Sequence, residues 1–354
     1  MANLPELSLE SFRGDFEGLE KMAHTSWRDE YGISSFPNFY RPAFLRYLFG
    51  RTEEKDHLIA AYRGGEIVSF LGNVPHTFQF RGQIYRGTWS CLLVTRKELL
   101  RQGHAVAIIN EALRINQKYK YDFALATFET GHRSTLMLRK LQAEGNRLEW
   151  MKRLRVIARI LDLRRVDASE GLKTWEKAAV KLIGGDRGPK KGGDAAVREY
   201  RQEDLGACLA LFNAYRDKIE LARVWEPDEL AWELTCPDVA QTLVYEKNGR
   251  VAGAINFICH DHLGETKERW AWINHVAYPD LTPGERFLFI QAFLRTIRAQ
   301  DCIGAIEWTK NYYPLGPLYR AHFFPYFRSV NLYSWTFNPE ISLSKVKECN
   351  EILV

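Results

Sequence analysis

The sequence predicts an α/β (α+β) protein built from two tandem units, each with a mixed central sheet flanked by helices. Landmarks recur in the same order at a nearly constant spacing, which indicates an internal duplication. The matched pairs are Gly65 and Gly249, Val94 and Val276, Gly103 and Gly284, and Leu138 and Tyr319. Each unit also repeats one order of patterns, namely hairpins followed by strand, helix, strand and helix. A chain of 354 residues is long enough for two domains that each bury a core.

The first unit is predicted at residues 1–165. Amphipathic spacing indicates helices near its start, and apolar runs separated by polar or glycine turns indicate a meander of strands after them. Pro42 suits a first helical turn, where its missing N–H needs no partner. The expected elements are helices 16–27 and 42–48, strands 58–62, 67–71, 76–80 and 88–94, helix 103–117, strand 123–128 and helix 134–141.

A connecting segment at 166–195 and a second unit at 196–345 are predicted next. The stretch from Gly184 to Gly193 is rich in glycine and lysine, so we expect an exposed linker that buries no core. The second unit is expected to contain strand 197–200, helix 205–215, a hairpin over 243–257, strand 270–276, helix 285–298, strand 303–308 and helix 315–322.

Composition narrows the function classes. A hydrophobic content of 46% with 26% charged residues is typical of a globular protein, and the net charge of +5 is too dispersed to predict a nucleic-acid partner. No apolar run reaches a membrane-spanning length, and residues 1–10 lack the pattern of a secretory signal. The six widely spaced cysteines predict reduced thiols and a cytoplasmic protein. The run His260-Asp261-His262 has no further ligand at metal spacing, so no metal site is expected.

A glycine at a predicted helix start is the first candidate binding motif. The strand ending at Val94 leads to Arg101-Gln102-Gly103-His104-Ala105, where the next helix begins. Such a junction presents unpaired backbone N–H groups to an anion, and glycine lets a phosphate approach closely. An ordinary strand–helix connection has the same appearance, so the pattern alone leaves both interpretations open.

Together with a second motif, this segment resembles the GNAT superfamily of acyl-CoA-dependent N-acyltransferases. The superfamily carries Gln/Arg-x-x-Gly-x-Gly/Ala in the loop that holds the coenzyme A pyrophosphate, and here Leu100 occupies the first position while Gly103 and Ala105 match. The second motif is a helix that follows an asparagine and contains a tyrosine. It reads Gly131 to Leu141 in the first unit, with Leu138 at the tyrosine position, and Asn311 to Phe324 in the second unit, with Tyr319 there.

The resemblance implies that the two units have different roles, one in donor binding and the other in catalysis. It assigns acyl-CoA binding to the first unit, through Leu93, Val94, Arg101, Gln102, Gly103, His104 and Ala105. The second loop suits an anion less, because Pro283 lacks an N–H, Glu285 adds negative charge and Arg286 is bulky. The second unit keeps Tyr319, which has the superfamily's role of donating a proton to the departing thiolate. Tandem members, including N-myristoyltransferase-like and mycothiol-synthase-like proteins, resemble this chain most.

Four residues are the catalytic candidates. Tyr319 is the candidate acid, and Glu129, Glu307 and His275 are the candidate bases that take a proton from an amine. Each also has a structural interpretation. The two glutamates could cap helices or face water, His275 could be a hydrogen-bonded strand residue, and Tyr319 could serve in packing.

The predicted activity is transfer of an acyl group from acetyl-CoA or another acyl-CoA to a small-molecule amine, with acetyl as the default. The 13% content of aromatic residues leaves a long-chain acyl donor open, whereas the mild charge disfavours aminoacyl-tRNA. A non-catalytic module with two degenerate units is the alternative from another class, because each unit lacks one motif.

Overall fold

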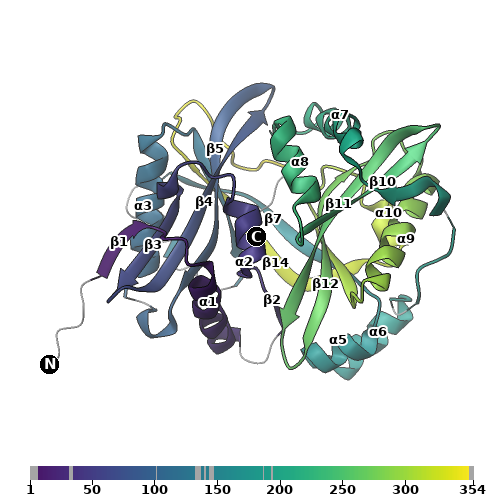
Figure 1. Ribbon diagram of the computed structural model, residues 1–354, viewed down its shortest axis with the longest axis horizontal. Helices are drawn as coiled ribbons and strands as arrows, with labels where there is room; N and C mark the ends of the chain where they lie inside the picture. Colours follow the sequence, from purple (N-terminus) through teal and green to yellow (C-terminus); the bar gives the residue numbers. More distant parts are fainter. Residues whose placement is uncertain are drawn as a thin grey trace.

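The computed structural model describes residues 7–31, 35–100, 102–131, 137–138, 141–142, 147–185, 187–192 and 194–350. A single mixed sheet runs through them (Figure 1). From one edge to the other it contains β1 (Leu7–Ser11), β3 (Leu58–Arg63), β4 (Glu66–Phe80), β5 (Gln83–Thr95), β6 (Phe123–Glu129), β14 (Phe324–Thr336), β7 (Leu148–Ile160), β13 (Gly304–Trp308), β12 (Lys267–Ala277), β11 (Arg250–Leu263), β10 (Ala240–Lys247) and β8 (Val197–Glu199).

Helices cover both faces of the first half of this sheet. Helix α3 (His104–Lys118) packs on the face that carries Ile59 and Ala61. Helices α1 (Phe16–Tyr31) and α2 (Pro42–Phe49) pack on the face that carries Ala60 and Tyr62. Successive strand residues point to opposite faces, so the two helix layers enclose the strands between them.

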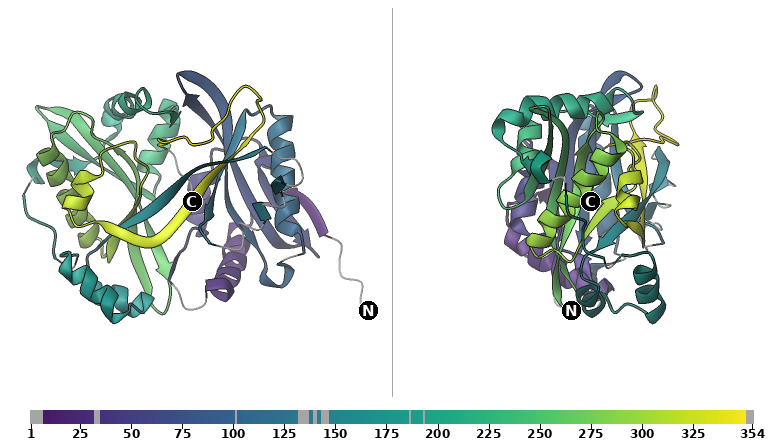
Figure 2. Two further views of the ribbon diagram at one scale, coloured as in Figure 1. Left: turned by 180° about the vertical axis from the view of Figure 1, so that it is seen from behind. Right: turned by 90° about the vertical axis from the view of Figure 1, so that its right-hand side faces the viewer.

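The second half carries its own helices. They are α7 (Leu205–Arg216), α8 (Pro227–Thr235), α9 (Pro283–Ala299) and α10 (Gly316–Arg320), and they share one apolar core with β10 to β13. Helices α5 (Leu163–Glu170) and α6 (Thr174–Leu182) connect the halves (Figure 2). None of the helices in the described ranges is long and apolar enough to cross a bilayer.

The order of elements is duplicated, as the sequence predicts. The series β3, β4, β5, α3 and β6 is matched by β10, β11, β12, α9 and β13. Among the strand pairs of the described residues, only β5–β6 and β12–β13 are parallel, so the parallel pair falls at the same place in each repeat. This arrangement confirms the predicted fold class of mixed sheets flanked by helices.

The two halves exchange strands at the centre of the sheet. Strand β14 lies between β6 and β7, and β7 pairs in turn with β13 of the second half. The short strands do the same, because β2 (Phe36–Pro37) pairs with β11 and β9 (Leu221–Arg223) pairs with β4. The sheet therefore does not separate at the expected unit boundaries, and the division at 1–165 and 196–345 stays a prediction about the repeat.

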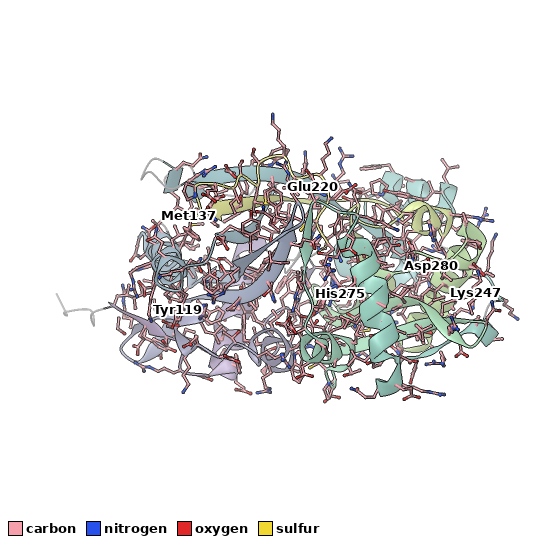
Figure 3. The ribbon with its side chains drawn as sticks, turned by 90° about the horizontal axis from the view of Figure 1, so that it is seen from above. Tyr119, Met137, Glu220, Lys247, His275 and Asp280 are labelled. Carbon is pink, nitrogen blue, oxygen red and sulfur yellow. The ribbon has the colours of Figure 1, made fainter. Side chains whose placement is uncertain are left out.

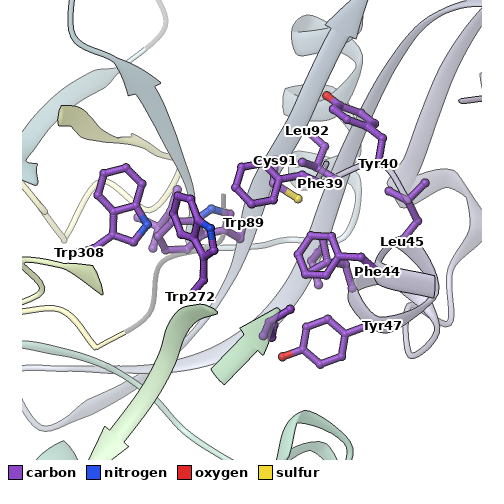
Figure 4. Close-up of a cluster of buried hydrophobic side chains, with 14 of the residues drawn as sticks. Phe39, Tyr40, Phe44, Leu45, Tyr47, Trp89, Cys91, Leu92, Trp272 and Trp308 are labelled. Carbon is purple, nitrogen blue, oxygen red and sulfur yellow. The ribbon is translucent and has the colours of Figure 1, made fainter. Parts of the chain in front are cut away.

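The apolar core also spans both halves. Trp272 and Trp308 of the second half face Phe39 and Leu92 of the first half in one cluster (Figure 4). The rings of Phe39 and Trp272 are 5.3 Å apart and perpendicular, and those of Trp272 and Trp308 are 6.0 Å apart. Burial of such large aromatic surfaces fixes the halves against each other.

Three sequence expectations need correction. Strands 67–71 and 76–80 are one strand, β4, because the residues between them are also buried and paired. Gly184 and Gly185, expected in an exposed linker, are buried, and the Arg159 guanidinium donates hydrogen bonds to the carbonyl oxygens of Gly185 and Arg187. Strands β7 and β14 were not expected, although both alternate between the two faces of the sheet. The helix expected at 134–141 lies largely outside the described residues.

The strand exchange predicts that the first half does not fold alone. A fragment of residues 1–195 lacks β14, so β6 and β7 each lose a neighbour and expose unpaired backbone groups. We expect this fragment to lack a cooperative thermal transition by circular dichroism, and co-expression with residues 196–354 to restore it. A cooperative transition in the isolated fragment would contradict the role assigned to β14.

Candidate functional site

The parallel strands β5 and β6 separate part-way along their length. They pair only from Gly87–Phe123 to Ser90–Ala126, and both strands continue beyond that point. A β-bulge interrupts the pairing of β5 with β4 in the same region, where Leu92 has a φ of 55°. A bulge re-aims backbone groups, and the facing edges of separated strands have unpaired N–H and C=O groups.

The gap between β5 and β6 joins two cavities. Leu92, Leu93, Thr127 and Phe128 line both of them. The smaller cavity, of about 70 Å³, lies on the α3 side of the sheet. The larger cavity, of about 250 Å³, lies on the α1 side and also borders β7, β11, β12, β13 and β14. We call the larger one the seam cavity, because both halves of the chain form its walls.

The start of α3 is open to an anion. Gly103 precedes the helix with a φ of 90°, and a side chain at this position would point into open space. In the described part of the chain, the backbone N–H groups of Gly103, His104 and Ala105 have no hydrogen-bond acceptor. Free N–H groups at a helix start, together with the helix dipole, attract anions.

The other predicted donor-binding residues lie on β5 and in the segment that leads to this start. Leu93 and Val94 are on β5 at the gap, and the Gln102 amide donates a hydrogen bond to the Glu98 carbonyl oxygen. Burial and the nearby Arg63 lower the pKa of the His104 ring. Arg101 is outside the described residues. Between the end of β5 at Thr95 and the start of α3 at His104 the chain makes one 3-10 turn, Lys97–Leu99.

The second repeat separates its strands in the same way, but its own side chains fill the gap. Strands β12 and β13 pair only from Trp270 to Trp272, and a bulge follows. The buried Lys310 ammonium donates hydrogen bonds to the carbonyl oxygens of Ile273 (3.4 Å) and Asn274. The Tyr312 hydroxyl accepts a hydrogen bond of 2.8 Å from the backbone N–H of Val276.

The second helix start is closed to anions. The Glu285 carboxylate accepts a hydrogen bond from the N–H of Thr282, whose hydroxyl accepts one from the N–H of Glu285. Lys247 forms an ion pair of 2.8 Å with Glu285, and this contact with the hydrogen bonds of Thr282 lowers the pKa of the carboxyl to about 2. A carboxylate therefore already occupies the place that an anionic ligand would take, in agreement with the weaker second loop expected from the sequence.

The four predicted catalytic residues are not gathered in one place. Glu129 lies at the end of β6 and lines the seam cavity. Tyr319 is on α10 with 45% of its surface exposed, and it lines none of the described cavities. Helices α10 and α3 are at opposite ends of the molecule (Figures 1 and 2). Tyr319 is therefore remote from the open helix start.

His275 belongs to a buried polar network. Its Nε2 is 3.1 Å from the Glu233 carboxylate, which also accepts hydrogen bonds from Tyr47 (2.7 Å) and Arg223 (2.8 Å). Burial alone would raise the pKa of Glu233, but Arg223 and His275 hold it below its usual range. Figure 3 shows His275 near the middle of the molecule, away from Lys247 at the second helix start. The Glu233 carboxylate is thus held by three side chains of the chain itself, which suits a structural role.

Glu307 lies beside the filled second gap. Its carboxylate is fully buried, 3.4 Å from the Lys310 ammonium. Burial raises the pKa of Glu307 to about 7, against the opposing effect of Lys310. Its contacts are with side chains that fill the second gap, so its position differs from that of Glu129 at the first gap.

Sequence reasoning missed Glu170 and Trp308, which line the seam cavity together with Glu129. They come from α5 and β13, which are far apart in the sequence and share no motif. Only strand exchange brings them together, so no local signal could have identified them. Within the described residues, no three His, Cys, Asp or Glu side chains are placed to hold a metal ion.

Solved structures show the same fold. The chain is similar to Saccharomyces cerevisiae N-myristoyltransferase with bound myristoyl-CoA, at a TM-score of 0.77 and 15% identity over 100% of this chain and 91% of that chain. The same enzyme with myristoyl-CoA and inhibitors gives a TM-score of 0.78 and 15% identity over 100% and 88% of the two chains. A GCN5-related N-acetyltransferase from Kribbella flavida gives a TM-score of 0.52 and 11% identity over 96% and 73%.

These similarities confirm the GNAT-like fold that the sequence motifs predict. At such low identities they establish the fold alone. Neither a protein-family model nor a curated protein matches the chain.

The buried Glu307 predicts a specific dependence of stability on pH. Its pKa of about 7 in the folded chain lies above the ordinary value of 4.5, so its contribution is fully present below pH 4.5 and is lost as the pH rises through about 7. The loss corresponds to about 3 kcal/mol for a shift of this size. We expect Glu307→Gln to flatten the change in free energy of unfolding between about pH 5 and pH 8, as measured by urea denaturation.

Glu265→Gln is the matched control, because it makes the same change in an exposed turn. This variant should keep the wild-type pH dependence. An unaltered pH dependence in Glu307→Gln would show that the carboxyl does not titrate in this range.

Proposed function

We propose that this chain is an acyl-CoA-dependent N-acyltransferase whose donor binds in the first repeat. The observation that carries the proposal is the asymmetry between the repeats. The first has an open strand gap next to an open helix start, whereas the second has both features filled by Lys310, Tyr312 and Glu285. One donor site per chain follows from this arrangement.

The donor would lie along the gap between β5 and β6. Its pyrophosphate would bind the N–H groups of Gly103, His104 and Ala105, which have no acceptor among the described residues and lie where the helix dipole favours negative charge. The thioester would then lie at the bulge of β5 beside Leu92 and Leu93. A backbone N–H on this unpaired edge would polarise the carbonyl and stabilise the developing oxyanion.

The seam cavity leaves room for a short acyl group together with a compact acceptor. Its volume of about 250 Å³ is close to the lower end of the range for small-molecule sites. We therefore propose acetyl as the transferred group and a small-molecule amine as the acceptor. A long-chain donor is the second candidate, supported by the aromatic walls and by the myristoyl-CoA bound in the similar N-myristoyltransferase. Comparison of acetyl-CoA and myristoyl-CoA as donors separates the two.

The proposed donor site predicts an effect of Gly103→Glu on acetyl-CoA binding. A carboxylate at this position places negative charge where the pyrophosphate would bind, so we expect the Kd in calorimetry to rise at least about tenfold. Gly284→Glu makes the same change at the closed second helix start and should leave the Kd unchanged. Gly103→Ala tests the backbone strain at φ 90° separately and should retain binding. Equal loss in both glutamate variants would refute a first-repeat site.

The position of Tyr319 gives a second prediction. Because its side chain is exposed on α10, far from α3, we expect Tyr319→Phe to keep turnover within about twofold of the wild type. The measurement is release of the coenzyme A thiol in the presence of an amine. A large loss of turnover with unchanged acetyl-CoA affinity would place the chemistry in the second repeat, as the sequence motif alone suggests. Absence of turnover for all amines, with acetyl-CoA still bound, would favour a binding module.

A further inference from the structure

The seam cavity has aromatic walls drawn from both halves of the chain. Trp27 and Phe39 come from the first half, and Trp272 and Trp308 come from the second half. Indole and phenyl faces bind apolar groups and attract cations through their quadrupoles. A ligand with an apolar body and a positive charge therefore matches the walls.

The carboxyl group of Glu170 lines the cavity among these aromatic residues. Glu170 is the last residue of α5 and accepts a hydrogen bond from the Tyr326 hydroxyl of β14. Burial raises the pKa of Glu170 to about 7, with Arg328 acting in the opposite direction and Glu176 in the same direction. The carboxyl thus exchanges its proton near neutral pH.

The charged groups of the cavity favour a cation. Glu129 and Glu170 line it with a single guanidinium, that of Arg328, which donates a hydrogen bond of 2.7 Å to the carbonyl oxygen of Ser35. His262 is buried, and burial, Arg328 and His260 keep its pKa well below the usual value, so the ring is neutral. Its Nε2 accepts a hydrogen bond of 3.0 Å from the Trp272 N–H.

One polar atom of the wall lacks a partner. Trp308 is 6% exposed, and its indole N–H has no hydrogen-bond acceptor among the described residues. A buried donor without a partner is costly, which indicates that the occupant supplies an acceptor atom. The carbonyl oxygen of an acyl group next to Leu92 would provide one, because Leu92 and Trp308 line the same cavity.

We propose that the seam cavity is the acceptor subsite and takes a primary amine on a compact aromatic or apolar body, whose ammonium binds the Glu170 carboxylate. This inference rests on the proposed function, because it places the amine on the α1 side of the gap through which the thioester would be reached. It extends that function by naming the class of acceptor and a group that touches it.

The proton balance of the reaction gives Glu170 a catalytic role. The bound ammonium passes one proton to the Glu170 carboxylate, and the nitrogen lone pair then forms the C–N bond with the thioester carbonyl carbon. The C–S bond breaks with its electron pair on sulfur, and the thiolate takes the second proton from nitrogen. The products are an amide and the thiol of coenzyme A, and Glu170 returns its proton to solvent.

The charged surroundings of Glu170 set the expected pH profile. Tyr326 and Arg328 face it from β14, Glu176 from α6, and His262 and Glu129 from other walls of the cavity. Because the pKa of Glu170 is about 7, the anionic form that binds an ammonium is lost as the pH falls below that value. Amine affinity should therefore weaken on acidification in the wild type and stay level in Glu170→Gln.

The experiment measures binding of 2-phenylethylamine to the full chain by calorimetry, with 2-phenylethanol as the uncharged analogue. We expect Glu170→Gln to weaken amine binding about tenfold, as for loss of a charge-assisted hydrogen bond, and to leave 2-phenylethanol and acetyl-CoA unaffected. Glu265→Gln is the matched control at an exposed carboxyl and should bind as the wild type does. Glu170→Asp keeps the charge and should restore part of the affinity, which separates a binding role from a folding defect.

Two outcomes would overturn the inference, and they are distinguishable. Normal acetyl-CoA binding with amine affinity that is absent or indifferent to Glu170→Gln would refute the acceptor subsite and leave the proposed function standing. Glu170-dependent amine binding in a chain that does not bind acetyl-CoA would refute the proposed function and reduce the cavity to a cation site. Thermal unfolding of each variant confirms that the comparison is made on folded protein.

Discussion

The position of β14 is the constraint on which the candidate site depends. Strand β6 is paired to β14 along its full length, from Phe123–Thr336 to Glu129–Val330, while β5 stays paired with β4 as far as Thr95. Each of the two parallel strands is thus held by its outer neighbour, and the pair opens between them after Ser90. The gap that would receive a thioester therefore lies between two strands that are each held by an outer neighbour, and one of these neighbours, β14, follows the second repeat in the sequence.

The two repeats have the same arrangement of strands and helices. They differ in whether side chains fill the strand gap and cap the helix start. Both parallel pairs separate and both contain a bulge at the same place. In the second repeat, Lys310 and Tyr312 satisfy the backbone groups that the gap exposes, and Glu285 satisfies the helix start. Buried backbone N–H and C=O groups need hydrogen-bond partners. A repeat that binds no ligand is therefore expected to supply these partners from its own side chains. In the first copy, no carboxylate caps the start of α3 among the residues that the structure describes.

The features that depend on residues close together in the sequence could be predicted from local patterns. The repeat, the helices expected at 16–27, 103–117 and 285–298, and the glycine at the start of the second of these helices were all visible as spacing or turn residues. The weaker anion binding of the second loop was visible too, because Glu285 places a negative charge at the start of its helix. The two expected strands in β4 were divided because Gly72 and Pro75 resemble turn residues, yet both positions are paired within a long strand.

The composition of the candidate site depends on the pairing of strands that are far apart in the sequence. This pairing could not be predicted from the spacing of residues. Glu170 ends an ordinary surface-pattern helix, and β14 brings the Tyr326 hydroxyl to its half-buried carboxyl. Tyr319 shows the limit of a motif, because the motif identifies the residue, whereas the structure leaves 45% of its surface exposed on α10. A motif reports the local helix, whereas function depends on which cavity that helix faces.

The shared walls of the seam cavity explain why a second repeat with a filled gap remains part of the site. The first repeat would hold the donor, but Trp272, Trp308 and His262 of the second repeat complete the enclosure around the place where the acceptor would react. A ligand bound there contacts both halves and therefore stabilises their docked arrangement by its own binding free energy. The second repeat thus contributes a wall of the cavity. The hydrogen bonds from Lys310 to the carbonyl oxygens of Ile273 and Asn274 hold the end of β12, and the rings of Trp272 and Trp308 pack 6.0 Å apart on the neighbouring strands β12 and β13.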